Sequence, residues 1–130
     1  MIDTIELIRA ATGARASAFA PYSSFQVGAA LLDEAGRVFL GCNVENVSFG
    51  LTMCAERVAV GAAVAAKSLK WKAIAIVSDS AEPVTPCGAC RQVLAEFNPS
   101  LKVISANLSG ATAEFDLENL LPLSRQGILG

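Results

Sequence analysis

Apolar residues recur along the chain with two different spacings, which predict helices alternating with strands. Near the N-terminus, Ile5, Ile8 and Ala11 follow the helical spacing, and Asp3 with Glu6 three residues later has the pattern of a helix N-terminal cap. Further along, short apolar runs bounded by turn residues indicate strands. In chain order we predict a first helix to about Phe19, a hairpin with strands at 25–32 and 37–45, a helix at 54–67, a strand at 73–77, a helix at 87–97, strands at 102–106 and 112–115, and a last helix at 117–121.

This order of elements predicts an α/β fold. Strands that are joined through helices are typical of a mixed sheet with helices on its faces. We therefore expect a three-layer α/β/α sandwich around a mixed five-stranded sheet, formed by a single domain over residues 1–130. The 130 residues contain no internal repeat, linker or low-complexity segment that would divide them.

The helix at 54–67 is apolar on every side, with small residues from Val58 to Ala66. Such a pattern is typical of a helix that is buried all round. The helix either packs against symmetry-related copies in an oligomer or is enclosed within one subunit, and the pattern favours neither. Composition favours subunits that cover one another, because 53% of the residues are hydrophobic and 17% are charged, against a charged share of about 25% in typical domains.

The charge balance argues against a polyanionic partner. Ten Lys and Arg against twelve Asp and Glu give a net charge of −2, and the lysines at 67, 70 and 72 are best interpreted as a solvated helix end. The longest uncharged stretch, 16–32, is interrupted by Pro21 and polar residues, so we expect no membrane span. Because acids come early and no secretory pattern is present, we expect a cytoplasmic protein with reduced cysteines.

The residues available for chemistry are restricted by the absence of histidine, which excludes Ser-His-Asp and Cys-His nucleophiles and imidazole metal ligands. Cys87 and Cys90 are three residues apart at the start of a predicted helix, so both sulfurs can bind one ion. Cys54 begins another predicted helix. Three cysteines at two helix starts favour a zinc site over thioredoxin-like redox chemistry, because Zn²⁺ prefers tetrahedral thiolate coordination.

Cys42 decides whether such a site would be closed or open. As a fourth ligand it would give a structural site of four thiolates. Strand alternation instead places Cys42 on one face with Leu40 and Val44, while Asn43 and Glu45 share the opposite face. We therefore expect Cys42 to be a small buried apolar residue and the fourth position to be open to water.

Glu56 and two arginines lie next to the predicted ligands. Glu56 follows Cys54 by two residues, and in a first helical turn both can reach beyond the helix end, which places a carboxylate where it can take a proton from a bound water. Three thiolates and one Zn²⁺ sum to −1, so we expect Arg57 and Arg91 to offset this charge by bonding the thiolates. The alternative is that they are ordinary surface or helix-pairing arginines.

Several motifs resemble one known family. Residues 54–56 (Cys-Ala-Glu) and 86–93 (Pro-Cys-Gly-Ala-Cys-Arg-Gln-Val) resemble the signature of zinc-dependent deaminases, with Cys in place of the commoner His as the first ligand. With residues 21–30, 41–46 and 118–122, the chain is similar over nearly its whole length to the small homotetrameric cytidine deaminases of the cytidine and deoxycytidylate deaminase superfamily.

This resemblance implies hydrolytic deamination of free cytidine and 2′-deoxycytidine to uridine and 2′-deoxyuridine with release of ammonia, in pyrimidine salvage. A zinc-bound hydroxide would attack C4, with one Zn²⁺ per subunit. The implied partners are the nucleoside substrate and three further copies of the chain, and the active sites would lie near the subunit interfaces. Neither nucleic acid nor a membrane is an implied partner. The implied roles are zinc ligation by Cys54, Cys87 and Cys90, proton transfer by Glu56, binding of the ribose 3′-hydroxyl by Asn43 and Glu45, packing on the pyrimidine by Phe25, and a backbone N–H contact from Ala55 to the base.

Two positions depart from the family pattern. Phe49 stands where the family often has Tyr, which removes a hydroxyl contact and keeps the capacity to stack. The C-terminal tail lacks the Phe that many members place in a neighbouring subunit's site, and Ile128 or Leu129 is the candidate substitute. The alternatives are a deaminase of a related small cytosine-containing substrate and, from another class, a non-catalytic zinc module with Cys42 as its fourth ligand.

Overall fold

A single five-stranded sheet organises residues 2–125, the part of the chain that this computed structural model describes. The strands run in the spatial order β2-β1-β3-β4-β5. Among them β3 and β4 are parallel, and the other neighbouring pairs are antiparallel. Their bounds are β1 (Val27–Asp33), β2 (Val38–Cys42), β3 (Trp71–Ser78), β4 (Lys102–Asn107) and β5 (Thr112–Asp116).

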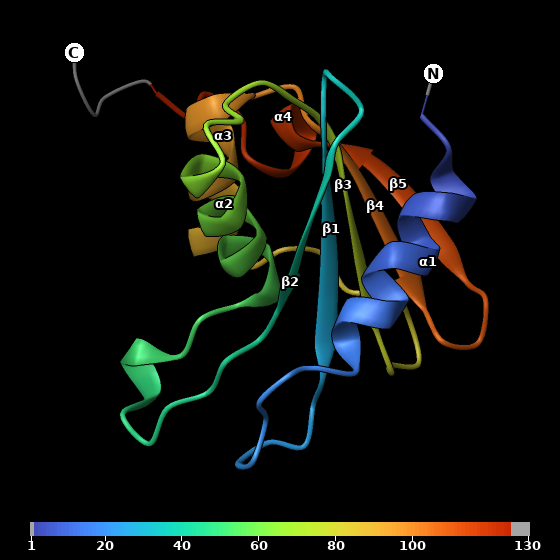
Figure 1. Cartoon of the computed structure of the whole chain (residues 1–130), viewed down its shortest axis with the longest axis vertical. Helices are drawn as coiled ribbons and strands as arrows, with labels where there is room; N and C mark the ends of the chain where they lie inside the picture. Colours follow the sequence, from blue (N-terminus) through green and yellow to red (C-terminus); the bar gives the residue numbers. More distant parts are fainter. Residues whose placement is uncertain (1, 126–130) are drawn as a thin grey trace.

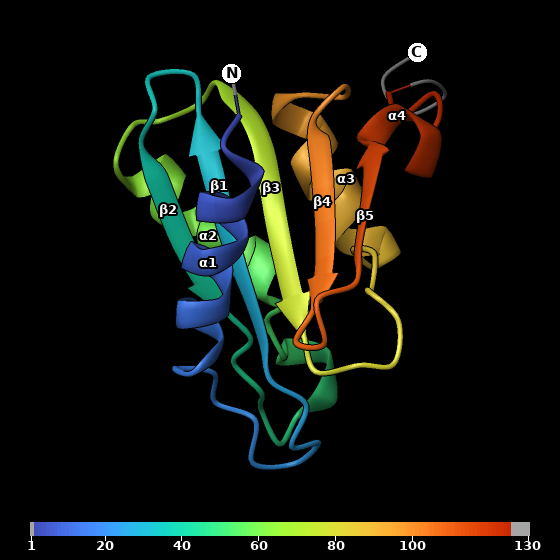
Figure 2. The ribbon, with the colours of Figure 1, turned by 90° about the vertical axis from the view of Figure 1, so that its right-hand side faces the viewer.

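Helices cover both faces of this sheet, which confirms the predicted α/β/α sandwich. Seen edge-on, α1 (Thr4–Arg15) lies on one face, and α2 (Ala55–Ala65) and α3 (Gly88–Phe97) lie on the other (Figure 1). A view turned by 90° shows α1 in front of β1 (Figure 2). Two short helices, η1 (Phe49–Leu51) and α4 (Leu117–Leu120), complete the fold. No helix within residues 2–125 has both the length and the apolar character needed to cross a membrane.

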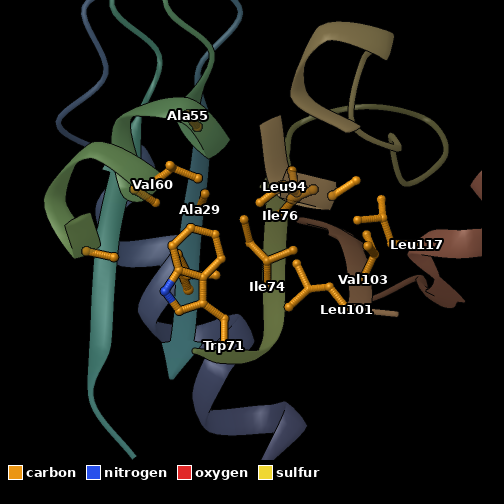
Figure 3. Packing of buried hydrophobic residues seen from close by; sticks show 14 residues of the cluster. Ala29, Ala55, Val60, Trp71, Ile74, Ile76, Leu94, Leu101, Val103 and Leu117 are labelled. Atoms are coloured by element: carbon orange, nitrogen blue, oxygen red, sulfur yellow. The ribbon is translucent and has the colours of Figure 1, made fainter. Parts of the chain in front are cut away.

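The larger part of the core lies between the sheet and the α2–α3 layer. Trp71 fills much of it, with its ring centroid 4.3 Å from that of Phe97 and its indole N–H donating to the Ser68 carbonyl at 3.0 Å. Leu94 of α3 and Ile74 of β3 lie in the same cluster (Figure 3). This packing fixes α2 and α3 relative to one another, and both helices begin at the same end of the sheet.

Gly41 allows α2 to approach β2 closely. A Cβ atom at this position would lie 2.2 Å from the Ala55 carbonyl oxygen and 2.5 Å from the Ala59 amide nitrogen. Real Cβ atoms are not found so close to backbone atoms. The glycine is therefore required for the position of the first turn of α2, which carries the candidate site residues.

The segment around Phe19 differs from the prediction. Asp3 caps α1 through a hydrogen bond from the Glu6 amide at 3.1 Å, as its pattern predicted, but the helix ends at Arg15 and not at Phe19. Phe19 instead pairs with Val44, with its N–H donating to the Asn43 carbonyl at 2.9 Å. This long-range pairing holds the chain that follows β2 against the loop that precedes β1.

Strand β2 is also shorter than predicted, because it ends at Cys42 rather than at Glu45. Beyond it, Val44 forms an isolated bridge with Met53. The predicted strand alternation therefore stops before Asn43, and the directions of the following side chains are set by these isolated bridges.

Helix α2 is not buried all round within one subunit. Its inner side, including Ala59 and Ala63, is fully buried against the sheet, whereas Gly61, Val64 and Ala65 are exposed. Of the two predicted arrangements, enclosure within one subunit is therefore wrong.

Candidate active site and metal centre

Three cysteine sulfurs meet where α2 and α3 begin. Cys54 is the N-cap residue of α2, Cys87 is the N-cap residue of α3, and Cys90 lies in the first turn of α3. The Cys87 Sγ lies 3.5 Å from the Cys90 Sγ and 3.9 Å from the Cys54 Sγ, and all three sulfurs are within 4.8 Å of one another. Two helix N-termini with their partial positive charge thus face the same point, which favours thiolates there.

This donor set fits a zinc ion. Sulfurs bound tetrahedrally to Zn²⁺ at about 2.3 Å are about 3.8 Å from one another. The separations of Cys87 from Cys90 and from Cys54, 3.5 and 3.9 Å, lie on either side of that value. Within residues 2–125, Cys42 is not part of the cluster. It is half-buried and lines a separate hollow with Leu40 and Val58. The cluster therefore offers three sulfur ligands and leaves one tetrahedral position for another molecule.

The surroundings of the sulfurs favour a thiolate at Cys54. A hydrogen bond from Cys90, together with smaller contributions from Arg57 and Cys87, lowers the pKa of the Cys54 thiol to about 5 against the opposing effect of burial. The same bond and burial raise the pKa of the Cys90 thiol. The Arg57 guanidinium donates through Nη2 to the Cys54 Sγ at 3.7 Å and to the Thr52 carbonyl at 3.2 Å. This is the contact that we expected of Arg57.

Arg91 has different partners from those that we expected. Its guanidinium donates to the Pro86 carbonyl at 2.7 Å, to the Leu120 carbonyl at 2.9 Å and to the Thr85 hydroxyl at 3.0 Å. All three of its nitrogens are used in these bonds, and Leu120 is at the C-terminal end of α4, where helix carbonyls lack partners. Arg91 thus ties the loop before Cys87 to α4, and the prediction that it bonds the thiolates is wrong for the described structure.

Glu56 lies in the first turn of α2 and is buried, with 5% of its surface exposed. Burial raises the pKa of its carboxyl group to about 7, and the charge of Cys54 adds to the effect. Glu56 lines a pocket of about 260 Å³ that also contains two of the three cysteines. A carboxyl group that titrates near neutrality beside a metal site can both accept and donate a proton.

The same pocket gathers most of the predicted substrate residues. Phe25, Asn43 and Ala55 line it with Glu56. Ala55 is the first residue of α2, and the first four N–H groups of a helix have no intrahelical acceptor, so its N–H is available to a ligand. Asn43 accepts a hydrogen bond from the Val27 amide at 2.9 Å and donates to the Phe25 carbonyl at 2.8 Å, which fixes its amide against the start of β1.

Glu45 lies in a neighbouring pocket. This second pocket, of about 330 Å³, contains Glu45 and Phe49 and shares Thr52 with the first. A hydrogen bond from the Ser23 hydroxyl lowers the pKa of the Glu45 carboxyl group, and the Tyr22 and Ser23 amides lower it further. Glu45 is therefore an ionised acceptor. Asn43 and Glu45 thus line adjoining pockets, and Phe49 is 89% exposed in the isolated subunit. Ile128 and Leu129 lie outside the described residues.

Five residues that line the pocket of Glu56 were not identified as site residues from the sequence: Val27, Thr52, Ile76, Val84 and Thr85. Thr85 comes directly before the Pro-Cys motif, and Thr52 comes two residues before Cys54. Proximity to a ligand motif was the available signal in both cases, but their side-chain type alone does not point to a site.

Comparison with known proteins agrees with this site. Residues 1–106 match the model of the cytidine and deoxycytidylate deaminase zinc-binding region. The cytidine deaminase of Sporosarcina psychrophila is 48% identical over 122 residues, which cover 93% of this chain and 90% of the relative. That of Halalkalibacterium halodurans is 50% identical over 122 residues, which cover 93% and 92%.

A solved structure supports the same assignment. The crystal structure of cytidine deaminase from Burkholderia pseudomallei superposes with a TM-score of 0.90 at 48% sequence identity, over 94% of this chain and 98% of that one. The residues matched by the zinc-binding family model, 1–106, include all three cysteines of the sulfur cluster. The chain therefore belongs to the cytidine and deoxycytidylate deaminase family.

Proposed function

We propose that this protein is a zinc-dependent enzyme that hydrolyses free cytidine and 2′-deoxycytidine to uridine and 2′-deoxyuridine, releasing ammonia. One observation carries the proposal: a three-sulfur cluster that fits zinc lies in one pocket with the buried Glu56, whose carboxyl group has a pKa raised by burial to about 7. The relatives of about 50% identity are named cytidine deaminases, which gives the substrate class. The reaction belongs to pyrimidine salvage.

The chemistry divides between the ion and the chain. Cys54, Cys87 and Cys90 would hold the zinc ion, which would supply a Lewis acid able to make water a nucleophile at neutral pH. Glu56 takes up one proton of the attacking water and donates it to N3 of the pyrimidine. It then takes the remaining proton of the hydroxyl group added at C4 and gives it to the amine, which leaves as ammonia when the C4–N bond breaks. Arg57, bonded to the Cys54 sulfur, reduces the negative charge of the thiolates.

The substrate is placed by residues of the two adjoining pockets. Phe25 packs against the pyrimidine and the Ala55 N–H contacts the base, while Asn43 and Glu45 bind the 3′-hydroxyl group of the ribose. Among the described residues, no Lys or Arg lines either pocket. Because Glu45 is ionised and no cation compensates a phosphate, nucleosides are favoured over nucleotides.

An ultraviolet assay tests the proposal directly. Loss of the cytosine chromophore is followed with cytidine, 2′-deoxycytidine, CMP and cytosine base, each with the zinc-loaded protein. We expect turnover of both nucleosides and little of CMP or the free base. Turnover of CMP alone would instead indicate a nucleotide deaminase, and a protein that binds zinc without turning over any of the four would support the non-catalytic alternative.

We further propose that the protein is a homotetramer with its sites near subunit interfaces. The exposed side of α2, with Gly61 and Val64, and the exposed apolar loop, with Val47 at 82% and Phe49 at 89% exposure, support this. In the isolated subunit a Cβ built at Gly61 has no atom within 4 Å apart from its chain neighbours and the nearby backbone of its own helix. Gly61→Leu should therefore leave the subunit folded and reduce the mass measured by light scattering, whereas a wild-type monomer would contradict the proposal.

The remaining proposals concern organisation and location. We propose that residues 1–130 act as one catalytic domain, supported by a sheet and core that run through the described part of the chain. A cytoplasmic location is supported by the need to keep the three ligand cysteines reduced.

A further inference from the structure

The turn before β1 is bonded to Glu45 through three donors. The Tyr22 and Ser23 amides donate to Oε1 of Glu45 at 3.0 and 3.2 Å, and the Ser23 hydroxyl donates to Oε2. The two segments are 22 residues apart in sequence, so the contact is part of the tertiary structure. It lies at the pocket that Tyr22, Ser23 and Glu45 line together.

These bonds limit how Glu45 can bind a ligand. An ionised carboxylate has about four lone-pair positions, two on each oxygen. The two amides occupy those of Oε1, and the Ser23 hydroxyl occupies one on Oε2. A single acceptor position remains, on the oxygen that Ser23 holds. It can accept one hydroxyl group, and its direction depends on the bond from Ser23.

Ser23 also contacts the segment that carries Phe25. The Ser23 hydroxyl oxygen accepts a hydrogen bond from the Phe25 amide at 3.0 Å while its hydrogen is donated to Glu45. The chain of bonds thus runs from the Phe25 N–H through one hydroxyl group to the Glu45 carboxylate. Phe25 lines the pocket of Glu56, and Glu45 lines the adjoining one. One small side chain therefore sets the position of a residue in each pocket relative to the other.

We infer that Ser23 is a positioning residue that orients Oε2 of Glu45 towards the 3′-hydroxyl of a nucleoside and so contributes to recognition of the sugar. The inference rests on the proposed function, because it assumes a nucleoside whose base lies by Phe25 and whose sugar lies by Glu45. Ser23 lines the pocket of Glu45 and not the pocket that contains Glu56 and the cysteines, so we assign it no part in the chemical step. Its effect is on substrate binding and on discrimination between sugars.

The experiment compares cytidine with 3′-deoxycytidine as substrates of the zinc-loaded enzyme. Ser23→Ala keeps both amide donors and removes the bond to Oε2, so we expect the KM for cytidine to rise about fivefold, as for loss of one exposed hydrogen bond to a charged group, with kcat within about twofold. The KM for 3′-deoxycytidine should rise less than that for cytidine, because only the loss of the bond from the Phe25 amide affects both substrates. Ser24→Ala is the matched control, because the Ser24 side chain makes no hydrogen bond within the described residues. Ser23→Thr, which keeps the hydroxyl, should have the wild-type KM.

A double-mutant cycle with Glu45→Gln tests whether Ser23 acts through Glu45. In that background the Ser23→Ala change should add less than about twofold to KM, because the charge that Ser23 orients has been removed. The inference would be overturned if Ser23→Ala discriminated against 3′-deoxycytidine as wild type does, or if the effects of the two substitutions on KM multiplied in the double variant. Turnover of cytidine by the wild-type enzyme would still support the proposed function in either case. Absence of wild-type turnover would instead refute both.

Discussion

Replacing Gly41 by alanine tests how strictly the fold positions the site. The new Cβ would lie 2.2 Å from the Ala55 carbonyl oxygen and 2.5 Å from the Ala59 amide nitrogen, where ordinary contact begins at 3.4 Å. Both neighbours are backbone atoms of α2, so they cannot rotate away. The first turn of α2 must therefore move by about 1 Å, because the densely packed core has no space to absorb the overlap.

This displacement is expected to lower both the stability of the protein and its turnover. Overpacking of this kind costs about 1–3 kcal/mol in the free energy of unfolding, and the upper end applies because backbone must shift. The first turn of α2 also carries Glu56 and follows Cys54. A misplacement of about 1 Å at reacting groups reduces turnover by about 10²-fold, so we expect this loss in addition to the lower stability.

The assay uses urea unfolding of metal-free protein in reducing buffer at fixed protein concentration, followed by zinc titration and nucleoside turnover. Gly13→Ala is the matched control. At this exposed position of α1 a Cβ has no atom within 4 Å apart from its chain neighbours and the nearby backbone of its own helix, and alanine should stabilise that helix by about 1 kcal/mol. A Gly41→Ala protein with wild-type stability, zinc affinity and turnover would show that the contact between β2 and α2 does not position the site.

Three further changes test the site and the core. Glu56→Gln keeps the shape of the side chain without its proton, so zinc stoichiometry should remain at one while turnover falls by about 10²–10⁴-fold; near-wild-type turnover would refute the assignment. Cys42→Ala should retain zinc whereas Cys87→Ala should lose it, both measured by metal analysis, and loss in Cys42→Ala would support a closed structural site. For Asp33, burial raises the pKa, but hydrogen bonds from Ser68 and the hairpin outweigh it and leave the pKa below its ordinary value. Asp33→Asn should therefore cost about 1–2 kcal/mol in urea unfolding at pH 7, and this difference should disappear as the pH falls through the lowered pKa; a difference that persists in acid would contradict the ionic role.

Local patterns were sufficient to predict the arrangement of the sulfurs. Cys87 and Cys90 share the start of one helix, and their spacing alone places both sulfurs at its N-terminus. Cys54 occupies the same place on α2. The element order implied one sheet with helices on both faces, so two helices that cover the same face could bring their N-termini together. The prediction was confirmed because each ligand depends on the local structure of its own helix.

Side chains outside regular elements were less predictable. Strand alternation predicted that the side chains of Asn43 and Glu45 share one face of a strand. Strand β2 ends at Cys42, however, so the alternation does not extend to these two residues. Glu45 is held by a turn 22 residues earlier, and Arg91 bonds the Leu120 carbonyl 29 residues later. No sequence pattern links the two members of either pair, because such bonds depend on how separate segments of the chain pack together.

The use of cysteine at two N-caps links zinc binding to the stability of the helices. Neither Cys54 nor Cys87 caps its helix with its side chain in the described structure. A residue that does not cap leaves a helix about 1 kcal/mol less stable than Ser or Asp would. Both sulfurs instead point to a shared position where the helix dipoles favour negative charge. Bound zinc would hold the two helix N-termini together through these sulfurs. Cys54 and Cys87 weaken each helix locally, but with metal bound they would stabilise the contact between α2 and α3, and this contact helps to position Glu56.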